Sequence, residues 1–241
     1  MRLLVTRPLP DAHHQADTLA RLGHEPVLAP LLRIEFSAGV SLPLAGAQAL
    51  IATSRNGLRA LAAHAERDEA LSLPLIAVGE ATAREAERLG FTRVTTGPGT
   101  GEALSQVILD RFEPSAGTLV HLAGETLAFD LKTSLQAHGF RVEQPVLYRA
   151  VAASELPAEA LGKLKAGALD GVILMSPRTA AVFVNLIRRH AAVTEAARLR
   201  CYCLSAAVAE AAARLCAVPR VAAHPREEDV LALISTDAAS L

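Results

Sequence analysis

Six short segments place hydroxyl groups, glycines or an arginine directly after apolar runs of the sequence. They are Thr6-Arg7-Pro8, Thr53-Ser54-Arg55-Asn56, Gly79-Glu80-Ala81-Thr82, Gly124-Glu125-Thr126, Ser176-Pro177-Arg178-Thr179 and Ser205-Ala206. Where such a segment begins a helix, free backbone N–H groups and the positive end of the helix dipole can bind carboxylates. The hydroxyls can also serve only as helix caps, as Ser176 before Pro177 would, so each segment alone leaves both roles open.

Apolar runs that alternate with helical periodicity predict the strands and helices that carry these segments. Strands are expected at 3–6, 49–53, 75–78, 118–123, 171–175 and 201–204, each followed by a helix. Gly23, Gly90 and Gly139 are placed to end three of the helices. The repeated order of strand, turn and helix predicts parallel sheets with crossover helices. In such sheets ligands bind beyond the carboxyl ends of the strands, where the six segments are expected.

Three segments of the first half recur in the same order in the second half. TLARLGHEPVLAPLL at 18–32 resembles SLQAHGFRVEQPVLY at 134–148. Residues 51–61 resemble residues 173–183, and residues 75–90 resemble residues 201–216. The recurrence predicts two similar α/β lobes with a cleft between them.

Composition and charge limit the classes of function. Lys and Arg total 24 against 25 for Asp and Glu, and aromatic residues make up 3% of the chain, which argues against binding of nucleic acid. No apolar run is long enough to cross a bilayer, and the opening MRLLVTRP does not read as a secretory signal. We therefore expect a cytoplasmic protein that binds neither nucleic acid nor membrane.

The cysteines and one glycine cluster suggest neither a metal nor a nucleotide site. Cys201, Cys203 and Cys216 are odd in number, so we expect core thiols rather than disulfides. No further Cys or His stands near them at the spacing of a zinc site. GPGTGE at 97–102 has Glu102 where a dinucleotide fingerprint needs its third glycine, so we interpret it as a turn into the next helix.

Taken together, the motifs resemble the uroporphyrinogen-III synthase family. The resemblance is carried by LLVTRP at the start of the chain, APLLRI, IATSRNGLRAL, AVGEATAREAERLG and the block LVHLAGE…HGF…V…PVLYR, and more loosely by DGVILMSPRTAAVF and YCLS…AHPREEDVLALI. It covers nearly the whole chain in the family's order. VGEATA together with the GE…G…V…YR block is its most specific part.

The resemblance implies a fold and an oligomeric state. Two lobes, each a parallel sheet flanked by helices, would be joined by a two-stranded linker with a cleft between them. Residues 1–34 and 153–241 would form a discontinuous lobe and residues 37–148 an inserted one. Residues 33–36 and 148–151 would be the linking strands, and the protein would be a monomer.

The resemblance also implies an activity. The family cyclises hydroxymethylbilane, a linear tetrapyrrole with eight carboxylates, to uroporphyrinogen III in tetrapyrrole biosynthesis. Water is lost and ring D is inverted, and no cofactor or metal takes part. Without an enzyme the same substrate closes to the isomer in which ring D is not inverted.

Several residues are candidates for this activity. Tyr148 corresponds to a family tyrosine proposed to assist the departing hydroxyl, and its alternative is a hinge residue that packs between the lobes. The candidate substrate-binding residues, with the hydroxyls acting chiefly on carboxylates, are Thr6, Arg7, Thr53, Ser54, Thr82, Gly124, Ser176 and Ser205. The alternative for Arg7 is a structural ion pair, and for Thr82 it is helix capping.

One departure from the family leaves a second interpretation open. The turn of the second lobe usually carries a threonine where this chain has Val208 or Ala207. We expect Val208 to line a helix N terminus near the cleft. Because a hydroxyl is missing there, the alternative function is a non-catalytic two-lobed binder or sensor of an anionic small molecule.

Overall fold

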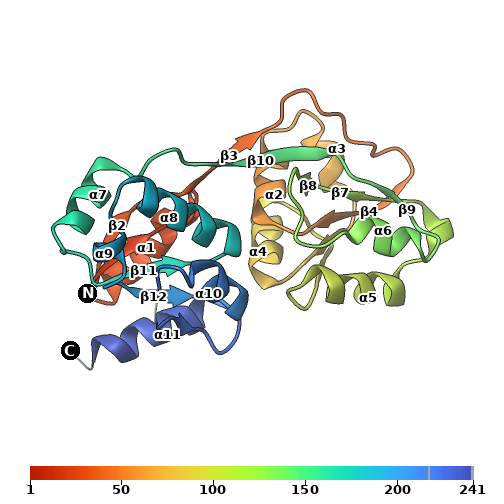
Figure 1. The fold of residues 1–241 in the computed structure, drawn as a ribbon. Helices are drawn as coiled ribbons and strands as arrows, with labels where there is room; N and C mark the ends of the chain where they lie inside the picture. Colours follow the sequence, from red (N-terminus) through yellow and green to blue (C-terminus); the bar gives the residue numbers. More distant parts are fainter. Residues whose placement is uncertain (217, 240–241) are drawn as a thin grey trace. The chain divides into compact units, whose positions relative to one another are not determined.

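The chain divides into two compact units in the computed structural model, which describes residues 1–216 and 218–239. Unit 1 consists of Met1–Arg33 with Val151–Leu241, and unit 2 of Ile34–Ala150. Each unit holds a five-stranded sheet. Figure 1 shows helices packed beside the strands in each unit. All the strand pairs recorded in these two sheets are parallel, which confirms the predicted fold class.

The sheet of unit 1 has the strand order β13-β12-β11-β1-β2. Its strands are β1 (Arg2–Val5), β2 (Glu25–Leu28), β11 (Gly171–Leu174), β12 (Arg200–Cys203) and β13 (Arg220–Val221). Side chains alternate between its faces: Leu3 and Val5 join one buried cluster, and Leu4 joins the other. Such alternation follows from the two-residue period of a strand.

Helices cover both faces of this sheet. Ala12 and Leu19 of α1 (Asp11–Arg21) and Val230 and Ile234 of α11 (Glu227–Ala238) pack on the face of Leu3. The other face is covered by α7 (Ala158–Lys165), α8 (Pro177–Arg189), α9 (Val193–Ala196) and α10 (Ala206–Ala212). Strands buried on both sides explain why the runs at 171–175 and 201–204 are almost wholly apolar.

The sheet of unit 2 has the order β6-β5-β4-β7-β9. Its strands are β4 (Ala47–Ala52), β5 (Leu75–Ala77), β6 (Val94–Thr96), β7 (Thr118–His121) and β9 (Arg141–Glu143). One face is covered by α2 (Arg55–Ala62), α3 (Arg67–Leu71) and α4 (Glu80–Leu89), and the other by α5 (Gly101–Arg111) and α6 (Leu131–Gln136). A short 3-10 helix, η1 (Pro114–Ala116), precedes β7.

The recurring sequence segments occupy corresponding positions in the two sheets. The pair β4–α2 corresponds to β11–α8, β5–α4 to β12–α10, and α6–β9 to α1–β2. Aligned in this way, the two strand orders agree strand for strand. The internal repeat in the sequence therefore reflects a repeat of topology.

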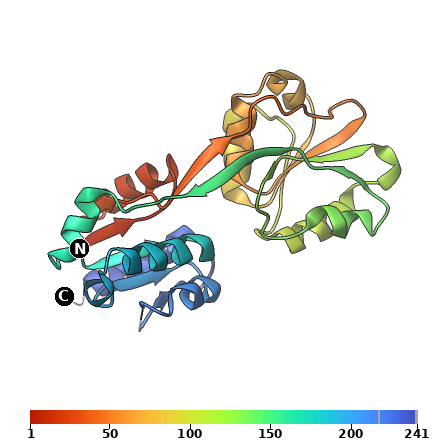
Figure 2. The same ribbon diagram turned by 45° about the horizontal axis from the view of Figure 1, so that its top comes forward.

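A third sheet contains β3 (Leu32–Phe36), β10 (Val146–Ala152) and β8 (Ala123–Gly124), in the order β3-β10-β8. Figure 2 shows β3 and β10 side by side. Both boundaries between the units fall inside these two strands. The run at 118–123, expected as one strand, is split: β7 ends at His121, and β8 pairs with β10 so that Gly124 lies opposite Tyr148.

Capping side chains and a glycine define four of the helix boundaries. The side chains of Ser54, Thr100 and Ser176 each accept a backbone N–H at the start of α2, α5 and α8. Because Thr100 caps α5, the prediction that GPGTGE is a turn into a helix is confirmed. Gly90, with φ of 117°, ends α4 in the left-handed conformation that glycine adopts most readily.

The cysteines correct one expectation. Cys201 and Cys216 form a disulfide with a Cα–Cα distance of 6.0 Å, although core thiols were expected. The turn after α10 brings Cys216 back beside β12, a proximity that residue counting does not reveal. Cys203 is a buried free thiol, as expected, and burial raises its pKa to about 11. The Cys203 thiol therefore stays protonated and is a poor nucleophile at neutral pH.

Reduction of the disulfide is expected to lower the free energy of unfolding. The two cysteines are 15 residues apart, and closing a loop of that size stabilises a fold by about 3 kcal/mol through loss of entropy in the unfolded chain. Urea unfolding of the oxidised protein, of the reduced protein and of Cys216→Ser measures the difference. The reduced protein and Cys216→Ser should agree, and Cys203→Ala should remain sensitive to reductant. Equal stability of the oxidised and reduced proteins would contradict the disulfide.

Candidate active site

The order of strands in unit 2 singles out the carboxyl ends of β4 and β7. From β4 the chain passes through α2 to β5 on one side, whereas β7 lies on the other side. Ligands of open parallel sheets bind at such a change of direction. Thr53 and Ser54 follow β4, and His121 ends β7. Three polar side chains thus meet at one point of the sheet edge.

A hydrogen-bonded chain of three side chains crosses this point. Thr53 Oγ1 lies 2.9 Å from His121 Nε2. His121 Nδ1 lies 3.3 Å from Gln144 Oε1. His121 is 1% exposed, while Thr53 and Gln144 are partly exposed. The imidazole therefore links two residues that solvent or a ligand can reach.

Burial lowers the pKa of His121, and the hydrogen bond with Gln144 opposes this only in part. The unfolded chain binds a proton at this histidine near pH 6.5, and the native state does so only at lower pH. The free energy of unfolding should therefore fall as the pH drops below about 6.5, with a slope of at most about 1.4 kcal/mol per pH unit from one histidine.

Urea unfolding between pH 5 and pH 8 measures this slope. His24, whose pKa is lowered by burial and by the neighbouring N-terminal ammonium, contributes in the same direction. His121→Phe should flatten the dependence while the share of His24 remains. A slope that is the same in the wild type and in His121→Phe would contradict a depressed pKa at His121.

Tyr148 lies on β10 beside the same point. Its phenol hydrogen-bonds to Ser54, and its backbone carbonyl accepts the N–H of Glu125 at 2.9 Å. The ring covers Gly124 so closely that a Cβ on Gly124 would stand 2.6 Å from Tyr148 Cζ. Burial raises the pKa of Tyr148, and the hydrogen bond to Ser54 lowers it by less. The phenol therefore keeps its proton at neutral pH.

Tyr148, Ser54, Thr53 and Gly124, four of the residues predicted from the sequence, are thus brought together in unit 2. His121 and Gln144 were missed. A signal for His121 was present, since a histidine inside the apolar run TLVHLA needs a polar partner if it is buried. The partner itself could not be found from the sequence, because it depends on the register of β7 against β4 and β9.

Three of the four predicted residues of unit 1 are engaged in structural contacts, whereas Ser205 stands at the N-cap of α10 without a capping side-chain hydrogen bond among the described residues. The Thr6 hydroxyl is fully buried and donates to the Ile173 carbonyl at 2.6 Å. Arg7 pairs with Asp11 and Glu227, the alternative that the sequence left open for it. Ser176 Oγ caps α8 by accepting the N–H of Thr179.

Two further positions lie in the first turns of α4 and α10. Thr82 is 5% exposed and its N–H donates to the Gly79 carbonyl. Val208, which corresponds to Thr82 in the internal repeat, is 1% exposed and belongs to the core on the α10 side of unit 1. Val208 thus lies at a helix N terminus, as expected, but the expectation that its side chain lines a binding site there is wrong, because it is packed in the core. A threonine at this position would point into packed side chains.

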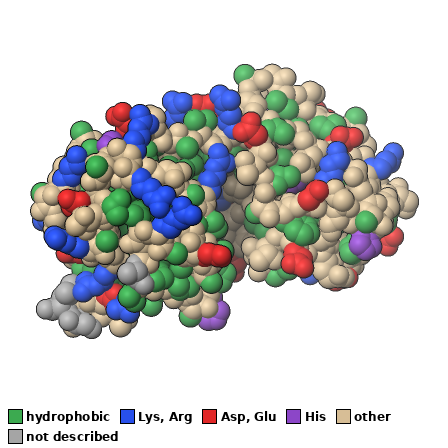
Figure 3. Space-filling view, in the orientation of Figure 1, with side chains coloured by type: hydrophobic (Ala, Val, Ile, Leu, Met, Phe, Trp, Pro, Cys, Tyr) green, Lys and Arg blue, Asp and Glu red, His purple; other side chains and the backbone are tan. Residues whose placement is uncertain are grey.

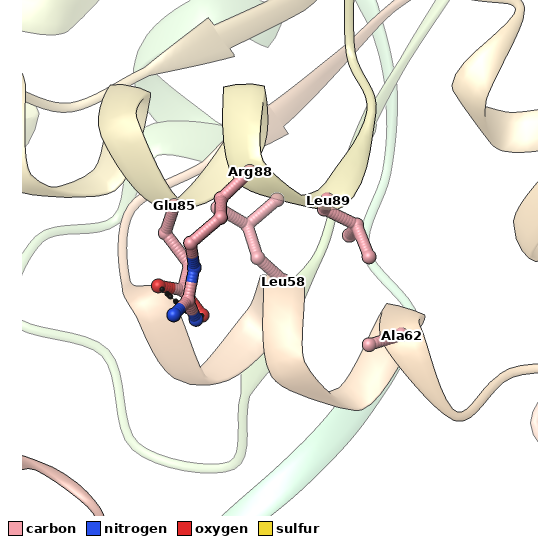
Figure 4. Close-up of a pocket in the computed structure, with 5 residues that line it drawn as sticks. All are labelled: Leu58, Ala62, Glu85, Arg88 and Leu89. Atoms are coloured by element: carbon pink, nitrogen blue, oxygen red, sulfur yellow. Dashed lines mark hydrogen bonds and ion pairs between the residues drawn. The ribbon is translucent and has the colours of Figure 1, made fainter.

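A pocket of about 270 Å³ lies elsewhere in unit 2, between α2 and α4. Its lining consists of Leu58, Ala62, Glu85, Arg88 and Leu89, which Figure 4 shows. Arg88 donates to both carboxylate oxygens of Glu85 at 3.0 Å, so the charges in the pocket are neutralised within it. The pocket contains none of the predicted residues.

Other kinds of site find no support in the described part of the chain. Among residues 1–216 and 218–239, no group of His, Cys, Asp and Glu side chains is arranged to hold a metal ion. Over the same residues, helices with the length and apolarity needed to cross a membrane are absent. Acidic and basic side chains are mixed over the face shown in Figure 3, in line with the net charge of −1.

Comparisons with known proteins agree with the resemblance in the sequence. The sequence model of the family described as "Uroporphyrinogen-III synthase HemD" matches residues 14–232. The fold is similar to that of the uroporphyrinogen-III synthetase from Helicobacter pylori, with a TM-score of 0.65, 18% identity and 98% of each chain covered. It is also similar to a mutant uroporphyrinogen III synthase from Thermus thermophilus, with a TM-score of 0.57, 19% identity, and 100% of this chain and 98% of that chain covered. No curated protein sequence matches the chain.

Proposed function

This chain belongs to the uroporphyrinogen-III synthase family, and we propose that it converts hydroxymethylbilane into uroporphyrinogen III. The terminal hydroxyl leaves as water, and an azafulvene forms on ring A. Ring D then attacks through its substituted carbon, and the resulting spiro intermediate fragments and recloses with ring D inverted. The protein is then a cyclising lyase that holds one conformer of its substrate and assists the loss of water.

The observation that carries this proposal is the hydrogen bond between Tyr148 and Ser54 at the head of α2. Ser54 Oγ already accepts the N–H of Asn56 at 3.1 Å, so its own proton is free to point to Tyr148 Oη. The phenol proton is then available to an outside acceptor, here the departing hydroxyl of the substrate. At neutral pH the phenol is protonated, as a proton donor must be, and burial, which raises the pKa of Tyr148, keeps it in that form.

Hydroxyls at helix N termini support binding of the substrate's carboxylates. Ser205 supports it best, since its side chain makes no capping hydrogen bond to α10 within the described chain. The hydroxyls of Ser54 and Ser176 are already used as caps, so at these two positions the backbone N–H groups of the first turn are the stronger candidates. We assign Thr6 and Arg7 the task of holding β1 in place beside β11 and α11.

The proposal is tested by mixing the protein with freshly prepared hydroxymethylbilane. The substrate should be consumed much faster than in buffer or with heat-denatured protein. Saturable binding of the substrate with no acceleration would instead support the non-catalytic binder. That alternative was based on the hydroxyl missing at Val208 or Ala207, of which Val208 is buried in the core and Ala207 is exposed.

A further inference from the structure

The chain of Thr53, His121 and Gln144 has a direction that follows from the chemistry of its members. Gln144 presents Oε1 to His121 Nδ1, and an amide oxygen only accepts hydrogen bonds. His121 Nδ1 must therefore carry a proton. A neutral imidazole has a single N–H, so Nε2 is left with a lone pair. The buried surroundings of His121 favour this neutral form.

The lone pair on His121 Nε2 determines what the Thr53 hydroxyl can do. Thr53 Oγ1 lies 2.9 Å from this nitrogen and must donate its only proton to it. The lone pairs of Oγ1 then remain for a ligand at the partly exposed side of Thr53. Thr53 accepts hydrogen bonds from outside and has no proton to offer.

We infer that Thr53, held by His121 and Gln144, recognises an N–H donor of the substrate, namely a pyrrole N–H, and not one of its carboxylates. The inference rests on the proposed function for the identity of the ligand. Carboxylates offer only acceptors at neutral pH, so two acceptors would face each other at Thr53. In a linear tetrapyrrole the ring N–H groups are the abundant donors. His121 is a positioning residue, because it acts on the substrate only through Thr53.

The position of Thr53 fits such a contact. Thr53 precedes Ser54, whose hydroxyl contacts the phenol of Tyr148. A pyrrole N–H on Thr53 would fix the plane of a ring next to the proton donor. Such orientation, and not charge pairing, is what selection of one substrate conformer requires.

Nuclear magnetic resonance of the unliganded protein tests the direction of the chain without any substrate. Two-bond correlations between ring protons and ¹⁵N distinguish a protonated from an unprotonated imidazole nitrogen. At pH 7.5 we expect Nδ1 of His121 to be protonated and Nε2 to be bare, with His121→Phe assigning the signals. A protonated Nε2 would mean that His121 donates to Thr53, which reverses the direction of the hydrogen bonds and overturns the inference.

Steady-state kinetics with hydroxymethylbilane tests the contact itself. Thr53→Val should lower kcat/KM by about 2- to 12-fold, the effect of one neutral hydrogen bond, whereas loss of a bond to a carboxylate costs roughly 12- to 150-fold. Thr53→Ser, which keeps the hydroxyl, should retain most of the wild-type kcat/KM. The control is Thr18→Val: Thr18 is a partly buried residue of α1 whose recorded hydrogen bonds join it to His14 and Arg21 of the same helix, and this change should leave kcat/KM unaltered. A loss in the larger range would contradict an N–H contact.

A double-mutant cycle separates positioning from general support of the fold. His121→Phe should lower kcat/KM in the wild type and have no further effect in Thr53→Val. Equal losses in both backgrounds would show that His121 serves the fold alone, and the inference would fail. If the wild-type protein does not accelerate the reaction at all, the proposed function fails, whereas a protonated Nε2 in an active protein overturns this inference alone.

Discussion

Tyr148→Phe is expected to slow the enzymatic consumption of hydroxymethylbilane by about 100- to 10,000-fold, the usual contribution of a general acid. Only the hydroxyl is removed, and the ring still packs over Gly124 and against the core of unit 2. Far-UV circular dichroism and urea unfolding should therefore remain close to the wild type. Initial rates under saturating substrate measure the effect.

A second prediction for Tyr148→Phe concerns the isomer of its product. The residual enzymatic product should still have the inverted ring, because the proposed function assigns control of the substrate's conformer to other residues. Near-normal turnover of Tyr148→Phe would mean that the phenol donates no proton to the leaving group. Tyr148, which lies on β10, would then be the hinge residue that the sequence allows as its alternative.

Gly124→Ala is expected to slow the reaction by about as much as Tyr148→Phe, although it leaves the tyrosine itself in place. The added Cβ would stand 2.6, 2.7 and 2.9 Å from Cζ, Cε2 and Oη of Tyr148. The ring must then move, and its hydroxyl leaves Ser54. The cost in stability should be limited to about 1–3 kcal/mol, as is usual for an added methyl group in a packed site.

Two comparisons make the Gly124 result specific. The double variant Gly124→Ala with Tyr148→Phe should be no slower than Tyr148→Phe alone, since both changes remove the same group. Gly162→Ala serves as the control, because no atom lies within 4 Å of the added Cβ in α7. It should keep full activity and gain about 0.5–1 kcal/mol in stability. A Gly124→Ala protein with wild-type rates would show that the position of the phenol is unimportant.

The sequence predicted the repeated architecture well, because its signals are local. Apolar runs, capping residues such as Ser54 and Ser176, and the glycine after α4 define elements within a few residues of themselves. The similarity of segments 18–32 and 134–148 predicted two similar halves, and these segments do occupy matching places in the two sheets.

The features that the sequence did not predict depend on contacts between residues far apart in the chain. The run at 118–123 gives no sign that the chain changes sheets at Leu122, yet this change puts Gly124 under Tyr148. The register of β4 and β7 brings Thr53 to His121, and no spacing in the sequence encodes it. Val208 and Cys216 were misjudged for the same reason, because their surroundings are made by other elements of unit 1.

The isomer of the product tests the central claim most directly. Freshly prepared hydroxymethylbilane is incubated with the wild-type protein, the product is oxidised, and the porphyrin isomers are separated. The proposed function requires that the inverted type III isomer predominates and that its share rises with protein concentration at the expense of type I. Formation of type I alone, at the rate seen in buffer, would contradict it.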